Sequence, residues 1–352
     1  MRIAQVAPLT EAVPPKLYGG TERVISWLTE ELVRQGHDVT LFASGDSQTA
    51  AKLEPMWPKA LRLDGSVRDP MCLHQMMIEQ VYRRAREFDV IHMHLDYLPF
   101  TVMSRQPVPF VTTLHGRLDL PEQQPLFDLW THVPVVSISD SQRRPLRQAR
   151  FAATIHHGLP ADLLRPVTDE PKYLAFLGRI CPEKRLDRAI EIAKAAGLPL
   201  KVAAKVDAVD VDYYDQKIKP LLDGNADVEF IGEISDAQKS DFLGNAIALL
   251  MPIDWPEPFG LVMIESMACG TPVIAFNRGS VPEVVEDGLT GFIVEDVPSA
   301  IGAVNKLGRL DRKAVRARFE QRFTAARMAE DYVDLYEDLI LKSSPVPRLA
   351  VA

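Results

Sequence analysis

The fold is constrained most by an alternation of short apolar segments with longer amphipathic ones, which runs through the chain twice. In the first pass the short segments are rich in β-branched residues and lie at 2–7, 39–43, 90–93, 110–114 and 135–138. The stretches between them repeat apolar residues at helical spacing, as between Thr21 and Gly36. Short buried strands that alternate with helices predict a parallel sheet covered by helices on both faces.

The alternation stops at residues 159–171, which contain three prolines and no periodicity, and then resumes. We predict strands at 173–177, 200–204, 228–231, 247–251 and 273–276, and helices at 186–196, 213–222, 236–245, 261–269 and 326–352. Ser235 is the predicted N-cap of the third of these helices. Because 352 residues suit about two domains, we predict an α/β protein with domains at 1–165 and 170–325, joined by a linker.

The composition excludes several classes of protein. Hydrophobic residues make up 47% and charged residues 25% of the chain, as in a folded globular protein rather than a disordered or fibrous one. No apolar run approaches the ~20 residues of a membrane-spanning helix, and the first residues do not form a secretory signal. The three cysteines are widely spaced and fit neither a disulfide framework nor a zinc site. These features predict a cytoplasmic protein.

The charge is distributed unevenly along the chain. Basic and acidic residues balance through residue 165, so the net charge of −8 falls entirely in the remainder. A nucleic-acid-binding protein needs a basic face, and we therefore predict no nucleic-acid partner. A phosphate-bearing ligand of the second domain would need cations at the site itself.

The segment after the predicted strand at 247–251 carries the strongest functional signal. Ligands of open α/β sheets bind in loops beyond the carboxyl ends of strands, and two such domains would place these loops around one cleft. Pro258 suits the first turn of a helix. The backbone N–H groups of Phe259, Gly260 and Leu261 would then be available to an anion.

Two carboxylates flank this predicted helix start. Glu257 precedes it and Glu265 lies just over one turn inside the helix. A carboxylate accepts hydrogen bonds from adjacent hydroxyl groups of a ribose or hexose. Considered alone, a capped buried helix with a glutamate that complements its dipole explains the same residues equally well.

This segment resembles the signature of family 4 retaining glycosyltransferases, which have the GT-B fold. The similarity lies in two glutamates separated by seven residues, within Pro-Glu-Pro-Phe-Gly-Leu and ahead of Ala-Cys-Gly-Thr-Pro-Val. Further similar motifs occur at 18–23, 176–179 with 183–184, 279–283 and 287–292, in order through about residues 1–340. The resemblance implies two Rossmann-like domains facing a central cleft, with a C-terminal helix, about 326–352, that packs back on the first domain.

The resemblance also implies roles for four catalytic residues. Arg179 and Lys184 match the family's phosphate-binding element, and their cations would stabilise the charge on a departing diphosphate. A surface salt bridge is the alternative for either residue alone. Glu257 would hold hydroxyl groups of the transferred sugar. His115 matches a family histidine near the sugar, where it could donate to the sugar or orient the acceptor.

Other residues are implied in substrate binding. Glu265 would hold the ribose hydroxyl groups, and Gly19 and Gly20 would let the backbone approach the diphosphate. Glu233 and Ile234 would hold the base through backbone atoms. The remaining residues implied at this site are Phe259, Gly260, Leu261 and Lys205, the last of which stands where the family often has a glycine-rich turn and is a candidate to contact phosphate or sugar.

The remaining patterns could suggest a metal site or a membrane-binding surface. Asp210-Val211-Asp212 matches the metal motif of a different glycosyltransferase fold, but we interpret it as a solvated acidic loop. His92 and His94 lack a third ligand at a familiar spacing, and His156-His157 is interpreted as structural. We therefore predict no essential metal and no cofactor besides the nucleotide sugar. Arg143, Arg147 and Arg150 would share a helical face, but Pro145 interrupts it, so peripheral membrane contact is not favoured.

The sequence thus predicts a retaining hexosyltransferase. It would move a hexose from a nucleotide-diphosphate sugar, with UDP-glucose or a close relative favoured, to a hydroxyl acceptor by a metal-independent same-face mechanism. A nucleotide-sugar epimerase or hydrolase of the same fold is one alternative. A non-catalytic nucleotide-sugar-binding protein is another. The sequence indicates neither the acceptor nor the oligomeric state.

Overall fold

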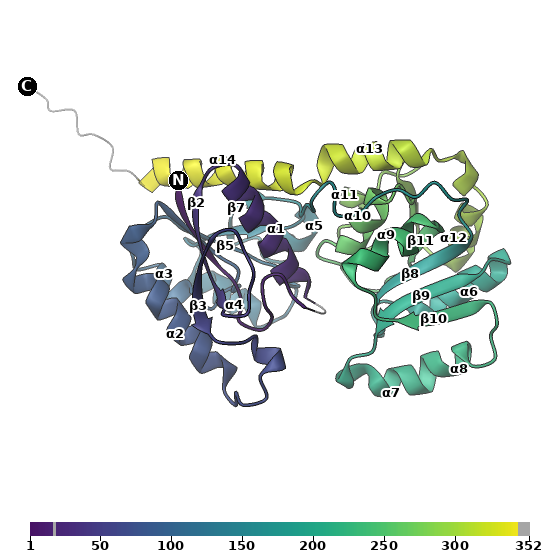
Figure 1. The fold of residues 1–352 in the computed structure, drawn as a ribbon, viewed down its shortest axis with the longest axis horizontal. Coiled ribbons are helices and arrows are strands. Elements are labelled where there is room, and N and C mark those ends of the chain that lie inside the picture. Colours follow the sequence, from purple (N-terminus) through teal and green to yellow (C-terminus); the bar gives the residue numbers. More distant parts are fainter. Residues whose placement is uncertain (17–18, 344–352) are drawn as a thin grey trace, which may run out of the picture. The chain divides into compact units, whose positions relative to one another are not determined.

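The computed structural model describes residues 1–16 and 19–343 of the protein (Figure 1). Its backbone contacts divide the chain into two compact units. Unit 1 comprises Met1–Ile138, Arg143–Gly158 and the chain from Ala325 onward, and unit 2 comprises Ser139–Gln142 and Leu159–Thr324. The chain therefore passes from one unit to the other after residues 138, 142, 158 and 324.

Unit 1 is built on a seven-stranded sheet in which every neighbouring pair is parallel. Its strands are β1 (Arg2–Val6), β2 (Asp38–Ser44), β3 (Lys52–Trp57), β4 (Val90–Met93), β5 (Phe110–Thr113), β6 (Pro134–Ser137) and β7 (Arg150–Thr154). They lie in the order β3-β2-β1-β4-β5-β6-β7. The helices are α1 (Gly20–Arg34), α2 (Pro70–Arg83), α3 (Phe100–Met103), α4 (Gln123–Leu129) and α14 (Ala325–Ser343), with α5 (Asp140–Arg143) containing residues of both units.

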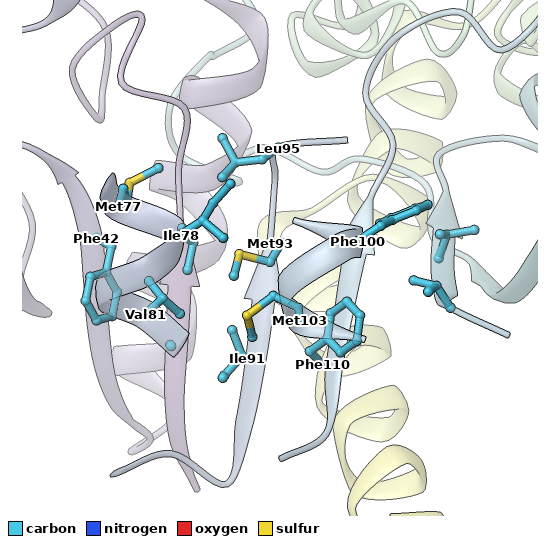
Figure 2. Close-up of a cluster of buried hydrophobic side chains, with 14 of the residues drawn as sticks. Phe42, Met77, Ile78, Val81, Ile91, Met93, Leu95, Phe100, Met103 and Phe110 are labelled. Atoms are coloured by element: carbon cyan, nitrogen blue, oxygen red, sulfur yellow. The ribbon is translucent and has the colours of Figure 1, made fainter. Parts of the chain in front are cut away.

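Helices cover both faces of this sheet. On one face α2 and α3 contribute Met77, Ile78 and Phe100 to a buried cluster with Met93 and Phe110 of the strands (Figure 2). Full burial of each such side chain stabilises the fold by roughly 1.5–3 kcal/mol. Elsewhere α14 packs against α1 and β4. The C-terminal helix is thus part of the core of unit 1.

Unit 2 contains a six-stranded sheet that is also entirely parallel. Its strands are β8 (Tyr173–Arg179), β9 (Leu200–Lys205), β10 (Val228–Gly232), β11 (Ala246–Met251), β12 (Val273–Phe276) and β13 (Gly291–Val294), in the order β10-β9-β8-β11-β12-β13. Its helices are α6 (Leu186–Ala196), α7 (Val211–Tyr213), α8 (Lys219–Leu222), α9 (Asp236–Gly244), α10 (Leu261–Ala268), α11 (Val281–Val284), α12 (Val297–Val304) and α13 (Arg312–Arg322).

The strand order reverses once in each sheet, next to the strand that begins the unit. The reversal lies between β1 and β4 in unit 1 and between β8 and β11 in unit 2. Ligands of open α/β sheets bind beyond the carboxyl ends of the strands at such a switch point. Each unit therefore offers one favoured edge for chemistry.

Every predicted strand is present, but three strands were not predicted. These are β3, β7 and β13, which lie at or beside the sheet edges. In β3 and β7 no residue is fully buried, so neither segment has the continuous apolar character of a central strand. This lack of buried residues explains why the apolar pattern did not indicate β3 and β7.

Several other predictions were wrong in detail. The helix predicted at 213–222 is divided among α7, a π-helical segment at Tyr214–Ile218 and α8. Leu159 is not in a loose linker, because its N–H donates to the carbonyl of Phe323 at 3.0 Å. Unit 2 also includes residues 139–142, where Glu283 accepts hydrogen bonds from two backbone N–H groups. Of the predicted final helix, residues 344–352 lie outside the described residues.

The arginines predicted to share a helical face do not do so. Only Arg143 lies in a helix, the four-residue α5, and its guanidinium stands 4.6 Å from the ring centroid of Phe151. Arg150 begins β7 and donates to the carbonyl of His132 at 3.1 Å. Within the described residues, no helix combines the length and apolar character that crossing a membrane requires.

Candidate functional site

Two cations end adjacent strands of unit 2. Arg179 is the last residue of β8 and Lys205 the last residue of β9, and the two residues are paired in the sheet register. The N–H of Ile180 continues the ladder by donating to the carbonyl of Lys205 at 2.8 Å. The parallel register thus places a guanidinium and an ammonium at the carboxyl edge, and β8 is itself one strand of the switch point.

Two carboxylates accompany these cations. Arg179 lies 3.7 Å from Oδ2 of Asp207 and 3.5 Å from Oδ2 of Asp210, and Lys205 Nζ lies 2.8 Å from Oδ1 of Asp207. Asp210 is buried, so the interpretation of its segment as a solvated loop was wrong for this residue. A diphosphate could replace these carboxylates as the partner of both cations, because a guanidinium binds phosphate oxygens through two parallel hydrogen bonds.

A second pair of charges joins the loops that follow β8 and β11. The N–H of Asp254 donates to the carbonyl of Glu183 at 2.8 Å and so ties the two loops together. Beside this tie the ammonium of Lys184 forms an ion pair with Oε2 of Glu257. The indole N–H of Trp255 donates to the same oxygen at 3.0 Å, and Lys184 Nζ stands 5.1 Å from the centroid of its ring. A carboxylate has about four acceptor positions, so Glu257 retains capacity for sugar hydroxyl groups.

The backbone of Glu257 is held by a close approach of the next loop. Gly279 has a φ of 57°, and a Cβ at this position would overlap the backbone of Glu257. The following N–H, of Ser280, donates to the carbonyl of Glu257 at 3.0 Å, and the Ser280 hydroxyl donates to the carbonyl of Phe259 at 2.8 Å. Glycine at 279 therefore fixes where the Glu257 carboxylate lies.

The helix after this loop, α10, begins at Leu261 as predicted. Pro258 therefore lies before the helix, and the expectation that it suits the first turn was wrong. Gly260 is the N-cap with a φ of 81°, a conformation that only glycine adopts readily. Phe259 buries its side chain against Phe323, at 6.2 Å between ring centroids, and so can offer a ligand only its backbone. Because the N–H of Met263 already donates to the carbonyl of Gly260 at 3.0 Å, this helix start can offer an anion the N–H groups of Leu261 and Val262.

Glu265 has a partner that the sequence analysis missed. Its side chain is buried in α10, and Oε1 lies 2.6 Å from Nζ of Lys239 on α9. The same ammonium lies 2.9 Å from Oδ1 of Asp236. Lys239 orients the carboxylate that the resemblance assigns to ribose. From the sequence, Lys239 could be recognised only as a lysine in the first turn of a helix that follows a strand end.

The loop that precedes α9 contains the two residues predicted to hold a base. Glu233 is exposed and Ile234 is half-buried. Ser235 is the N-cap as predicted, and its N–H donates to Oε1 of Gln238 at 3.0 Å. Lys239 in the next turn links this helix to Glu265. The segment predicted to contact the base and the one predicted to contact ribose are thus adjacent.

The candidate histidine of unit 1 lies in a cluster of imidazoles. His115 follows β5, is half-buried, and has its Nε2 2.9 Å from Nδ1 of His94. Its ring also stacks on that of His157, with centroids 5.4 Å apart and planes 20° from parallel. The backbone N–H of His115 donates to Oδ1 of Asp96 at 3.3 Å. His92 also lies in this cluster, 4.0 Å from His94 between ring centroids.

Burial determines the charge of this cluster. Burial lowers the pKa of His92, His94 and His157 well below the ordinary value, and lowers that of His115 to about 3. The imidazoles are therefore neutral near pH 7. Burial also raises the pKa of Asp96 to about 6. In the part of the chain that the structure describes, no three His, Cys, Asp or Glu side chains form a group that could hold a metal ion, and metal independence stays a prediction.

The predicted glycines begin the first helix of unit 1. Gly19 is the N-cap of α1, and a Cβ there would stand 2.9 Å from Cβ of Pro15. Gly20 is the first residue of the helix. In the same turn Glu22 is buried, and this burial raises the pKa of its carboxyl. Unit 1 therefore contains Gly19, Gly20 and His115, and unit 2 contains all the other predicted site residues.

Models of two protein families match consecutive parts of the chain. The model of Glycosyltransferase Family 4 matches residues 18–163, and that of Glycosyl transferases group 1 matches residues 165–322. The chain belongs to the group 1, family 4 glycosyltransferases. The resemblance found in the sequence motifs is thereby confirmed.

Relatives match this chain over different lengths. It is 34% identical to the D-inositol 3-phosphate glycosyltransferase of Streptomyces avermitilis over 51% of this chain but only 39% of that relative. It is 25% identical to the phosphatidyl-myo-inositol mannosyltransferase of Mycobacterium leprae over 98% of this chain and 99% of that relative. It matches 48% of an uncharacterized 41.2 kDa protein of Klebsiella pneumoniae, so it spans less than half the length of some of its relatives.

Solved structures share the fold of this chain. Sucrose-phosphate synthase from Thermosynechococcus elongatus has a TM-score of 0.74 at 20% identity, covering 97% of this chain and 99% of that one. HepE of Anabaena, solved in complex with UDP and glucose, has a TM-score of 0.71 at 19% identity, covering 96% of this chain and 100% of that one. These likenesses confirm the predicted fold class, a GT-B protein with two Rossmann-like α/β domains.

Proposed function

We propose that the protein is a retaining hexosyltransferase that uses a nucleotide-diphosphate sugar and a hydroxyl acceptor and needs no metal. The observation that carries the proposal is the pair of cations, Arg179 and Lys205, at the ends of adjacent strands beside the switch point of unit 2. Net acidic surroundings make such a local concentration of positive charge informative. A diphosphate is the ligand group that this arrangement fits.

Each candidate residue has a role in this reaction. The bond from the sugar C1 to the diphosphate oxygen breaks, and a bond from C1 to the acceptor oxygen forms on the same face of the ring. The acceptor's proton passes to the leaving diphosphate. Arg179 and Lys184 would stabilise the negative charge that grows on that diphosphate, which lowers the barrier more than it strengthens ground-state binding. Their fixed cations would supply the charge that a metal ion supplies in other enzymes.

Hydroxyl groups of the donor would be held by acceptors. Glu257 keeps acceptor capacity beside its Lys184 pair and would bind the transferred hexose. Glu265, oriented by Lys239, would bind the ribose. His115 would contact the sugar. UDP-glucose is the favoured donor, supported by the structural likeness to HepE solved with UDP and glucose.

A binding panel tests the proposal first. Thermal unfolding is followed with UDP-, GDP- and ADP-sugars, each with and without EDTA, and with uridine as a control that lacks the diphosphate. A ligand at about 100 times its Kd stabilises the protein by about 2.7 kcal/mol. We expect stabilisation by UDP-glucose that EDTA leaves unchanged and that uridine does not reproduce. No stabilisation by any nucleotide sugar would overturn the proposal.

Turnover separates the proposal from its alternatives. The donor that binds is incubated with a panel of hydroxyl acceptors that begins with inositol phosphates, since relatives are named for them. Transfer with the anomeric configuration retained, observed by NMR of the product, supports the proposal. Consumption of donor in water alone at full rate favours a hydrolase. Binding without turnover against the whole panel favours a non-catalytic protein.

A further inference from the structure

A buried chain of hydrogen bonds leads from β1 to the candidate histidine of unit 1. Gln5 lies on β1 and pairs in register with His92 on the adjacent strand β4. Its Oε1 lies 2.8 Å from Nε2 of His94. Nδ1 of His94 in turn lies 2.9 Å from Nε2 of His115. Gln5 and His94 are both fully buried, so water does not compete for these bonds.

The nitrogen of the Gln5 amide faces the C-terminal helix. Its Nε2 donates to the hydroxyl of Tyr336 on α14 at 3.1 Å. That hydroxyl lies 2.6 Å from Nδ1 of His92, on the same side of the amide. Because the amide nitrogen is directed to Tyr336 and His92, the amide oxygen is directed to His94. An amide oxygen only accepts, so the proton of this bond belongs to Nε2 of His94.

The next bond in the chain then has only one polarity. Burial lowers the pKa of His94 and of His115, so both rings are neutral and each has one N–H and one lone pair. With its proton on Nε2, His94 accepts at Nδ1. His115 must therefore donate from Nε2, which leaves its Nδ1 as an acceptor. The orientation of one buried amide thus determines the tautomer of a histidine two residues further along the chain of bonds.

We propose that Gln5 and His94 are positioning residues that hold His115 as the Nε2–H tautomer, so that Nδ1 accepts a hydrogen bond from a hydroxyl group of the sugar. The identity of the ligand rests on the proposed function, but the tautomer does not. The stacking of His157 on His115 holds the plane of the ring, and the backbone N–H of His115 donates to Asp96, which holds the backbone at this position. His115 is accordingly a hydrogen-bond acceptor toward the sugar and not a proton donor.

The tautomer is measured directly in the ligand-free protein. Protein labelled with ¹⁵N-histidine gives ring-nitrogen shifts that distinguish a protonated from an unprotonated nitrogen, and His115→Asn assigns the signal. We expect His115 to show a protonated Nε2 and an unprotonated Nδ1 near pH 7.5. A protonated Nδ1 would overturn the proposal, whatever the protein does catalytically.

Three variants test whether Gln5 sets this tautomer. Gln5→Leu removes the acceptor for His94, and we expect the His115 signal to become a mixture of tautomers. Gln5→Glu keeps an acceptor for His94 and should keep the wild-type signal. Gln123→Leu makes the same change at a buried glutamine outside this chain of bonds and should also keep it. A wild-type tautomer in folded Gln5→Leu would overturn the role of Gln5.

The ligand side of the proposal is tested with donor analogues. In the presence of UDP-glucose, Nδ1 of His115 should shift as a nitrogen that accepts a hydrogen bond, while UDP alone should leave it unchanged. Gln5→Leu should lower kcat/KM about tenfold, as expected for one lost hydrogen bond, and Gln5→Glu should restore most of it. No shift with a bound sugar would overturn the contact. Failure of every nucleotide sugar to bind would instead contradict the proposed function and leave the tautomer result standing.

Discussion

The two parallel sheets reverse their strand order in the same way, yet their carboxyl edges carry different kinds of polar group. In unit 1 the edge holds neutral imidazoles joined by short hydrogen bonds, such as that between His94 and His115. In unit 2 it holds ion pairs, such as those of Arg179 with Asp210 and of Lys184 with Glu257. The same backbone scaffold therefore supports two opposite ways of placing polar groups at a strand end.

The difference follows from desolvation at the edge of unit 1 and from ion pairing at the edge of unit 2. Burial lowers the pKa of His92 and His94, so desolvation keeps both rings neutral and each of their bonds has a fixed direction. The charged groups of unit 2 form ion pairs, so their cations can exchange a carboxylate partner for an anionic ligand. Under the proposed function, the neutral His115 of unit 1 would contact a sugar hydroxyl group, and the ion-paired cations of unit 2 would bind phosphate. Four experiments test this comparison.

Acid should destabilise unit 1 far more than unit 2. Below pH 6.5 the unfolded histidines bind protons that His92, His94 and His157 do not bind when folded, so stability falls as the pH falls. Each contributes about 1.4 kcal/mol per pH unit, or up to about 4 kcal/mol together at pH 5.5. Hydrogen exchange of β4 and β11 amides at pH 7.5 and 5.5, corrected for intrinsic rates, measures this. Equal loss of protection in both strands would break the comparison.

Replacing Arg179 should have the next largest effect, and on turnover rather than stability. Arg179→Ala removes a donor to the leaving diphosphate, and we expect kcat to fall by two orders of magnitude or more, about 2.7 kcal/mol. Steady-state kinetics with the donor identified by binding give the value. Arg83→Ala, which breaks an exposed ion pair with Glu79, is the matched control and should leave kcat unchanged. Near-normal turnover in Arg179→Ala would refute its assigned role.

The close approach that holds Glu257 can be tested with two glycines of positive φ. Gly279→Ala would place a Cβ into the Glu257 backbone, whereas at Gly288, with a φ of 76°, no atom lies within 4 Å of a Cβ. Both changes carry backbone strain, so their difference isolates the overlap. We expect Gly279→Ala to lower the free energy of unfolding by about 2 kcal/mol more than Gly288→Ala. Urea denaturation measures both, and equal losses would contradict the close approach.

The smallest effect is expected at Asp96, whose charge is disfavoured where it lies. Its pKa of about 6 lies above the unfolded value of 3.8, so its contribution to stability falls as the pH rises from about 4 to 6. Asp96→Asn should therefore raise the free energy of unfolding at pH 7.5 by about 1 kcal/mol, allowing for its partial exposure. Asn also tolerates the φ of 48° at this position.

A matched aspartate should respond in the opposite direction. Asp89 forms an ion pair with Arg2 at 2.7 Å, which holds the pKa of its carboxyl below the ordinary value. Asp89→Asn should cost up to about 1 kcal/mol at pH 7.5, as for other partly exposed pairs. Chemical denaturation of both variants at pH 4.5 and 7.5 checks the signs. A loss of stability in Asp96→Asn at pH 7.5 would contradict the burial of its charge.

The sequence by itself determined the two parallel sheets and most of the strand ends. Strand-helix alternation reports which segments are buried, and the residue after a buried strand in a parallel sheet must lie at its carboxyl edge. For that reason Arg179 and His115 could be placed without a structure. The motifs around Glu257 and Glu265 likewise indicated the family, since each is a local run of residues.

Only the tertiary structure decided which side chains meet. Lys239 with Glu265 and Asp210 with Arg179 come from different elements, and Gln5 and Tyr336 are 331 residues apart in the sequence. Local periodicity indicates which face of an element is buried but not which residue of another element lies against it. Hydrogen bonds and ion pairs act over about 3–4 Å, so the partners, and with them the charge and tautomer of each site residue, depend on how the elements pack.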